Sequence, residues 1–254
     1  MNLAVILARG GSQRVPRKNV RPFAGRPMLA WPIAAVRASG LFDAVLVSTE
    51  DDEIAAVARA EGAEVPFRRP SELADDRTGT LAVMAHALDW FETHRGPVEL
   101  ACCIYGTAAF LRPEHLRAGL ELLRAHSDAD FVFSVTTYSH PIFRAFQRAE
   151  DGRVTMFWPE HEQTRSQDLP VAWHDAGQFY WGRPTAFRTC GGIFSARAYG
   201  VPIPRHLVQD IDTPEDWELA ERLFALARSA SERFMDGKAL LPNDLPSGLF
   251  PNGL

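Results

Sequence analysis

Two aspartates near the C-terminal end of the chain have a spacing that suits chemistry on a phosphate. Asp210 and Asp212 are separated by one residue in a short segment whose pattern is typical of extended backbone. Alternate residues of an extended segment project to the same side, so the two carboxylates are expected to be neighbours. Carboxylates combine with phosphate oxygens and water as ligands of Mg²⁺. The pair predicts a magnesium site, although an acidic strand end before a capped helix has the same sequence.

A basic glycine turn near the N-terminus suits an anion. The turn at 10–12 follows an apolar run at 3–7, and four cations surround it: Arg9, Arg14, Arg17 and Lys18. Fixed cations around a glycine turn at the end of a strand favour polyphosphate binding. The segment matches neither GxxxxGK[ST] nor GxGxxG, so a solvated basic loop is the alternative. Together with the aspartate pair, the turn indicates a nucleotide–metal site, where cations hold phosphates and a metal offsets developing charge.

The elements that must position these residues alternate along the chain. Apolar runs predict strands, and helical periodicity with capping signals predicts helices. A last helix is expected to run to about residue 231, because its start has an N-cap at Thr213, a proline at Pro214 and an acidic N3 residue at Asp216. We expect an α/β fold with a Rossmann-like, mostly parallel sheet flanked by helices. The expected strands are 3–7, 44–48, 64–67, 99–105 and 131–135, and the other expected helices are 27–39, 49–60, 81–94 and 113–125.

The pattern changes between residues 138 and 187. Prolines, aromatics and polar residues mix there, which predicts short irregular or antiparallel strands before residues 179–181 return to the sheet. Such an excursion is usually functional or an interface. We therefore expect one domain over 1–231 that contains this excursion, and a Pro- and Gly-rich tail over 232–254.

Composition narrows the functional classes. The 254 residues are 46% hydrophobic and 23% charged, which is typical of a globular protein, and the net charge of −5 argues against a general nucleic-acid surface. Cys102, Cys103 and Cys190 form no CxxC pair, which favours packing in a reducing compartment. No secretion signal and no apolar run of 18 residues is evident, so we expect a cytoplasmic protein without a membrane partner.

Five ordered blocks then resemble one enzyme family. They are LARGGSQRVPRKN (7–19), RPSELADD (69–76), ACCIYGTAAFL (101–111), HDAGQFY (174–180) and QDIDTPEDW (209–217). The chain resembles the CMP-sialic acid synthetase family of cytidylyltransferases, and YGTAAFL, TRSQDL and HDAG are most similar to its pseudaminic acid branch. The resemblance implies that the anomeric hydroxyl of a nonulosonic acid attacks the α-phosphate of CTP, which gives a CMP-sugar and pyrophosphate. It also implies Mg²⁺ and a homodimer.

The resemblance assigns roles to individual residues. Catalytic roles fall on Arg9, Lys18, Asp210 and Asp212, and the two aspartates are the metal ligands. Arg69 and Thr80 fall where relatives contact cytosine and its surroundings. The chain departs from the family at Gln13, where a lysine is usual, and Arg14 is the nearest substitute for that charge. The implied nucleotide-binding residues are Leu7, Ala8, Arg9, Gly10, Gly11, Ser12, Arg14, Lys18, Asn19, Arg69 and Thr80.

The sugar-acid pocket is expected from the YGTAAFL segment and the excursion. The acid's carboxylate needs a cationic or amide partner, for which Arg165 is the candidate. YGTAAFL and HDAG replace the QPTSPL-like and NGA-like segments of sialic acid relatives, which argues against sialic acid. The substrate-binding candidates are Tyr105, Thr107, Arg165, Gln167, His174, Asp175 and Gln178, with His140 and Arg144 also considered. For each excursion residue, a surface position or a structural hydrogen bond is the alternative.

Aromatic residues of the excursion point to its second role. They either line the pocket or pack against a partner chain, and the implied homodimer favours the interface for several of them. They are Phe143, Phe146, Phe157, Trp158 and Trp173.

Three other functions are compatible with parts of the sequence. A cytidylyltransferase for sialic, legionaminic or an eight-carbon keto-deoxy acid would use the same chemistry with a different pocket. An inactive nucleotide-binding regulator would have no need of the aspartate pair. A nicotinamide-dependent dehydrogenase is disfavoured by the cationic first loop and the missing GxGxxG.

Overall fold

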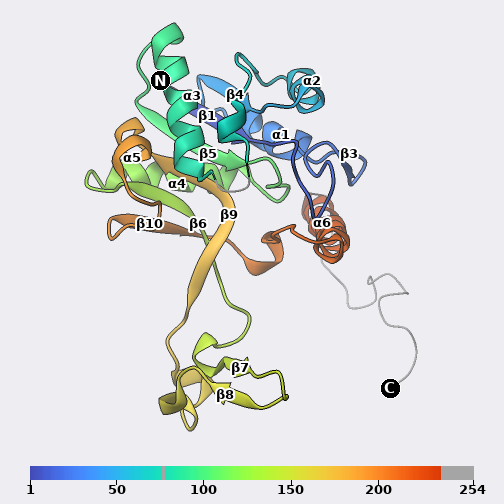
Figure 1. Ribbon diagram of the computed structural model, residues 1–254, viewed down its shortest axis with the longest axis vertical. Helices are drawn as coiled ribbons and strands as arrows, with labels where there is room; N and C mark the ends of the chain where they lie inside the picture. The colour runs from blue at the N-terminus through green and yellow to red at the C-terminus, as the bar shows by residue number, and fades with distance from the viewer. Residues whose placement is uncertain (76–77, 236–254) are drawn as a thin grey trace.

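A six-stranded sheet forms the centre of the computed structural model, which describes residues 1–75 and 78–235 (Figure 1). The strand order is β10-β6-β9-β5-β1-β4, and every strand is parallel to β1 except β9. The predicted α/β, mostly parallel sheet is therefore confirmed. The strands of the sheet are β1 (Asn2–Leu7), β4 (Ala44–Ser48), β5 (Leu100–Tyr105), β6 (Phe131–Thr137), β9 (Trp173–Gly182) and β10 (Ala198–Pro202).

Helices cover both faces of the sheet. The face that carries Ala4 and Ile6 of β1 packs against α1, α2, α4 and α6, and the face that carries Leu3 and Val5 packs against α3 and α5. This alternation along β1 is the reason for its continuous apolar sequence, since both faces of a central strand are buried. The helices are α1 (Ala30–Ser39), α2 (Asp52–Ala60), α3 (Thr80–Arg95), α4 (Pro113–Ala125), α5 (Pro184–Thr189) and α6 (Pro214–Met235).

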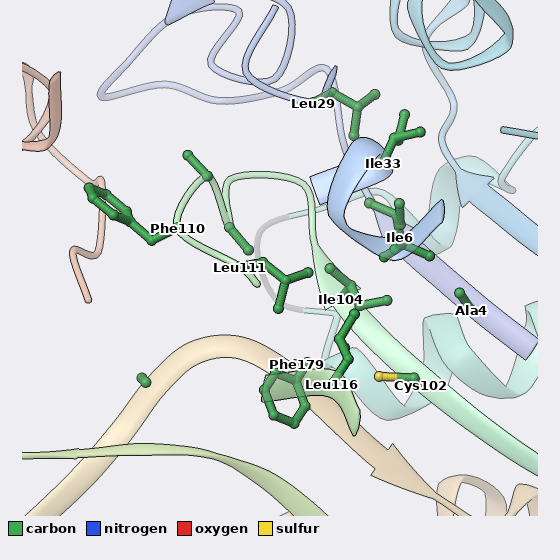
Figure 2. Close-up of a cluster of buried hydrophobic side chains, with 14 of the residues drawn as sticks. Ala4, Ile6, Leu29, Ile33, Cys102, Ile104, Phe110, Leu111, Leu116 and Phe179 are labelled. Carbon is green, nitrogen blue, oxygen red and sulfur yellow. The ribbon is translucent and has the colours of Figure 1, made fainter. Parts of the chain in front are cut away.

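The larger core cluster joins segments that are distant in the sequence. Figure 2 shows Leu111, Leu116 and Phe179 gathered near Cys102 and Ile104 of β5. All five side chains are buried. This packing fixes β5 and β9 relative to the helices, while the parallel pairing that ends at Leu7 and Tyr105 holds the carboxyl ends of β1 and β5 side by side.

The excursion leaves the sheet after β6 and returns along β9. It contains a small hairpin of β7 (Phe146–Arg148) and β8 (Val154–Met156), drawn well away from the sheet in Figure 1. The predicted antiparallel pairing and the return of 179–181 to the sheet are confirmed. The structure assigns Trp173–Gly182 to β9 and Pro184–Thr189 to α5, so the excursion outside the sheet is 138–172.

Several boundaries differ from the sequence-based prediction. The strand expected at 64–67 is wrong, because only an isolated bridge joins Glu64 to Leu46. The last helix continues to Met235, and residues 236–254 of the expected tail lie outside the described residues. The short strands β2 (Pro22–Phe23) and β3 (Arg26–Pro27), the edge strand β10 and the six-residue α5 have no counterpart in the prediction. Among the described residues, no helix is both long and apolar enough to cross a membrane.

Candidate active site

A cleft of about 410 Å³ lies at the carboxyl ends of β1 and β5. This is where parallel α/β sheets place their ligands. Twelve of the residues singled out from the sequence line it: Leu7, Arg9, Ser12, Arg14, Lys18, Asn19, Arg69, Thr80, Tyr105, Thr107, Asp210 and Asp212. The structure therefore brings the basic turn and the aspartate pair, which are nearly 200 residues apart in the chain, to one site.

The loop after β1 is fastened to the segment after β4. The Gly10 N–H donates to Oε1 of Glu50 at 2.6 Å, and the Asn19 side-chain amide donates to the Arg9 carbonyl at 2.9 Å. A Cβ on Gly10 would lie 2.6 Å from Oδ2 of Asp51, so only glycine fits without displacement. Ala8 is buried, and Gly10 and Gly11 adjoin the cleft without lining it. The glycine turn thus shapes the loop whose side chains face the cleft.

Two cations of this loop reach the aspartate pair. Lys18 Nζ donates to the Ile211 carbonyl at 2.6 Å and lies 3.6 Å from Oδ1 of Asp212, while Arg14 Nη2 is 2.8 Å from Oδ2 of Asp212. Asp210 is exposed to the cleft. Loss of solvent around its carboxyl group and the neighbouring Asp212 carboxylate raise the pKa of Asp210. Cations and carboxylates therefore form one mixed cluster at this end of the cleft.

The start of α6 holds the aspartate pair in place. Asp216 Oδ2 accepts from the backbone N–H groups of Asp212 and Thr213, at 3.1 and 2.8 Å. The Asp216 N–H in turn donates to Oγ1 of Thr213 at 3.2 Å. This reciprocal capping box is the one that the sequence predicts, and it fixes the backbone that carries Asp212.

Arg17 joins the loop after β1 to the start of α2. Its guanidinium forms ion pairs with Asp51 and Glu53, and these hydrogen bonds raise its pKa. Arg17 also adopts a left-handed backbone conformation, with φ of 56°. Of the four cations around the turn, Arg9, Arg14 and Lys18 line the cleft and Arg17 does not.

A buried arginine forms the side of the cleft next to β4. Arg69 is 5% exposed, and its guanidinium donates to the hydroxyl and the carbonyl of Ser48. Burial lowers its pKa. On the other side of the β1 loop, the Thr80 hydroxyl lies 3.1 Å from the Tyr105 hydroxyl. The cleft therefore has a cationic centre, with an arginine on its β4 side and a hydroxyl pair on its β5 side.

The remaining sugar-acid candidates lie outside the cleft lining. Arg165 and Gln167 are exposed on the excursion, where Arg165 pairs with Asp168 at 2.7 Å. His174 and Asp175 are half-buried on β9, and His174 Nδ1 lies 2.8 Å from the Asp175 carbonyl. Gln178 is 3% exposed and donates to the Leu207 carbonyl at 2.7 Å, while its Oε1 has no partner. None of the five lines the cleft of its own chain.

Sequence reasoning gave no individual role to seven residues that line the cleft, although it expected the strand end at 106–109 to approach a ligand. They are Gln13, Val15, Leu73, Asp75, Thr78, Val83 and Gly106. Leu73 and Asp75 belong to the RPSELADD block, which was a usable signal. Gly106 follows β5, and a Cβ there would lie 2.6 Å from Oδ1 of Asn19 and 3.1 Å from the Leu7 carbonyl. Its requirement for glycine depends on this close approach of two strand ends.

Comparison with known proteins now decides the family. A family model described as cytidylyltransferase matches residues 3–239. The chain belongs to this cytidylyltransferase family. It is 40% identical to a pseudaminic acid cytidylyltransferase of Campylobacter jejuni over 223 residues, which cover 88% of this chain and 96% of the relative. The expected family, and with it a nucleotidyltransferase enzyme, is confirmed.

More distant relatives share the same domain. N-acylneuraminate cytidylyltransferase B of Danio rerio is 33% identical over 86% of this chain and 50% of its own length. The solved structure of CMP:2-keto-3-deoxy-manno-octonic acid synthetase complexed with CTP superposes with a TM-score of 0.65 at 16% identity, and covers 89% of this chain and 99% of that one. The last comparison shows that this cytidylyltransferase has a nucleotidyltransferase fold.

Proposed function

We propose that this cytidylyltransferase transfers CMP from CTP to the anomeric hydroxyl of a nonulosonic acid, and that the acid is pseudaminic acid. The anomeric oxygen forms a bond to the α-phosphorus and releases its proton to solvent. The bond between that phosphorus and the oxygen bridging to the β-phosphate breaks, and pyrophosphate leaves with the electron pair of that bond. The observation that carries the proposal is 40% identity to a pseudaminic acid cytidylyltransferase over 88% of the chain. The cleft, with cations around a strand-end glycine turn, supports it.

The basic turn is suited to the triphosphate. Arg9, Arg14 and Lys18 line the cleft around the glycine turn, and charge-assisted hydrogen bonds from such groups favour phosphate oxygens. They would stabilise the negative charge that develops on the leaving pyrophosphate. Ser12 and Asn19, which also line the cleft, belong to the same triphosphate-binding loop, and Arg69 and Thr80 are assigned to the cytosine and its surroundings.

The aspartate pair is the proposed metal site. Asp210 and Asp212 fit Mg²⁺ because two neighbouring carboxylates repel each other, and burial together with the Asp212 carboxylate raises the pKa of Asp210. In the described part of the chain, no group of three or more His, Cys, Asp or Glu side chains is arranged to hold a metal, so phosphate oxygens and water would complete the coordination. Bound Mg²⁺ would polarise the phosphate and offset its charge.

The excursion is the proposed interface of a homodimer. It and the adjoining end of β9 expose large apolar side chains that a second copy could cover, namely Phe146, Val154, Phe157, Val171 and Trp173. Arg165 and Gln167 lie on the same excursion, so their proposed contact with the sugar acid requires that this segment approach a cleft.

We also assign the protein to the cytoplasm, where CTP is made and used.

A second sugar acid remains a specific alternative. The similarity to N-acylneuraminate cytidylyltransferase B favours N-acetylneuraminic acid as the competing substrate, with the same transfer reaction. The other alternative is a catalytically inactive nucleotide-binding regulator, in which the cleft cations and the aspartate pair would no longer support transfer. The competing enzyme would release pyrophosphate with a different acid, whereas the regulator would release none.

Pyrophosphate release tests the proposal. The full chain is incubated with CTP and Mg²⁺ and with pseudaminic acid, N-acetylneuraminic acid or an eight-carbon keto-deoxy acid. We expect release with pseudaminic acid, its loss when a chelator removes the metal, and its return with added Mg²⁺. Release with another acid alone would refute the assigned substrate, and CTP binding without release from any acid would support the regulator.

A further inference from the structure

Two cations of the β1 loop contact Asp212, one at each carboxylate oxygen. Arg14 Nη2 lies 2.8 Å from Oδ2 of Asp212, and Lys18 Nζ lies 3.6 Å from Oδ1. The backbone of Asp212 is held separately, because its N–H donates to Oδ2 of Asp216 at 3.1 Å. Asp212 is therefore anchored through its backbone, and the partners of its two oxygens can change without moving the residue.

The two cations differ in how firmly they are placed. The Lys18 side chain is 19% exposed and donates to the Ile211 carbonyl at 2.6 Å, so it is held independently of Asp212. The Arg14 side chain is 67% exposed and lines the cleft. Ion pairs between exposed side chains are weak, so Arg14 can exchange Asp212 for another anion at little cost.

Arg14 and a magnesium ion would compete for the same carboxylate. Mg²⁺ binds carboxylate oxygens at about 2.0–2.1 Å in near-octahedral geometry. A guanidinium 2.8 Å from Oδ2 of Asp212 would place its positive charge beside such an ion, and the two like charges would repel. The triphosphate of CTP offers Arg14 another partner, since a planar guanidinium binds phosphate oxygens bidentately.

We infer that Arg14 is an exchangeable counter-ion of Asp212, which it neutralises in the free protein and leaves for the triphosphate when CTP and Mg²⁺ bind. The inference rests on the proposed function. It gives Arg14 two opposite effects: Arg14 weakens the binding of the metal alone, and it strengthens the binding of CTP together with the metal. A residue that only contacts phosphate, or only stabilises the loop, would not weaken metal binding.

Manganese binding to the full chain without nucleotide tests the first effect. Mn²⁺ serves as a paramagnetic substitute for Mg²⁺, and electron paramagnetic resonance distinguishes its free and bound forms. We expect Arg14→Gln to lower the Kd for Mn²⁺ about two- to fivefold, the size expected for loss of one exposed ion pair. Arg68→Gln is the matched control and should leave this Kd unchanged, because Arg68 is 68% exposed, pairs with Asp52 at 2.9 Å and lies outside the cleft lining.

Calorimetric titration with CTP in the presence of Mg²⁺, and without sugar acid, tests the second effect. We expect Arg14→Gln to raise the Kd for CTP about tenfold, as is typical for loss of one charge-assisted hydrogen bond, and Arg68→Gln to leave it unchanged. A variant that combines Asp210→Asn with Asp212→Asn should lose Mn²⁺ binding, which would show that the aspartate pair holds the ion.

The outcomes separate this inference from the proposed function. Unchanged or weaker Mn²⁺ binding by Arg14→Gln would overturn the inference, and so would an unchanged Kd for CTP. Equal tightening of Mn²⁺ binding by Arg68→Gln would also overturn it, since the change in net charge would then explain the effect. Absence of Mn²⁺ binding by both the wild type and Arg14→Gln would overturn the inference together with the metal site. Neither titration uses a sugar acid, so a wild-type chain that releases no pyrophosphate would overturn the proposed transfer and leave these tests decisive.

Discussion

The contact between the β1 loop and the start of α2 can be tested by adding one methyl group. A Cβ on Gly10 would lie 2.6 Å from Oδ2 of Asp51 and 3.1 Å from its Cβ, whereas a Cβ on Gly11 would meet nothing within 4 Å. Neither glycine adopts a left-handed backbone conformation. Gly10→Ala and Gly11→Ala therefore make the same chemical change at adjacent positions and differ only in the space available.

The magnitude follows from how firmly Asp51 is held. Its Oδ1 accepts from the N–H groups of Glu53 and Ile54 at 3.0 Å each, and its Oδ2 accepts from Arg17 at 2.5 Å. Loss of a helix N-cap costs about 1 kcal/mol, and overpacking costs about 1–3 kcal/mol. We expect Gly10→Ala to lower the free energy of unfolding by about 2 kcal/mol and Gly11→Ala to change it by less than about 0.5 kcal/mol.

Thermal and urea unfolding of the full chain provide the measurement. For a domain of this size, about 2 kcal/mol corresponds to a Tm that is about 4–8 °C lower. Asp51→Ala removes the obstructing carboxylate, so adding Gly10→Ala to it should cost much less than adding it to the wild type. Equal melting of the Gly10 and Gly11 variants, or an undiminished cost in the Asp51→Ala background, would refute the steric argument.

Three further predictions follow from the same structure. Arg17 lowers the pKa of Asp51 to about 2, so the urea-unfolding advantage of the wild type over Asp51→Asn should be constant above about pH 5 and decline between about pH 4 and 2. Gly119→Ala would put a Cβ 2.8 Å from the Trp181 ring, so it should lower the free energy of unfolding by about 1–3 kcal/mol. The same substitution at an uncrowded helix position would raise the free energy of unfolding, because alanine favours the helix more than glycine does. Lys18→Met should lower kcat/KM for CTP about 10- to 100-fold in the pyrophosphate assay, and an unchanged value would contradict its phosphate role.

The parts of the fold that were predictable from sequence depend on local signals. The strand Ala44–Ser48 and the helix Pro113–Ala125 begin and end where the apolar pattern and Pro113 predict. Gly40 ends α1 in a left-handed conformation, with φ of 64°. The edge strand β10 escaped prediction because it contains Gly200 and ends at Pro202, residues that weaken strand signals and are tolerated at an edge.

The residue types of the candidate site were predictable from the sequence, but the contacts between residues that are distant in the sequence were not. The cations of the β1 loop could be listed from the sequence, but their partners could not. Lys18 donates to the carbonyl of Ile211, 193 residues away, and Arg17 is withdrawn from the cleft by Asp51 and Glu53. Both assignments depend on which strand ends are neighbours in the sheet, and that order is a property of the whole fold.

A bulge in β9 shows most clearly why a residue's role did not follow from its type. The letters of HDAGQFY assign Asp175 to a polar pocket, and a regular strand would send it and Tyr180 to opposite faces. The register against β6 shifts between Phe133 and Val135, and only this shift turns Asp175 toward the buried Tyr180 hydroxyl. Register is set by pairing between strands, so a single sequence does not specify it. A substitution that straightened the bulge would therefore separate Asp175 from Tyr180 without changing either residue.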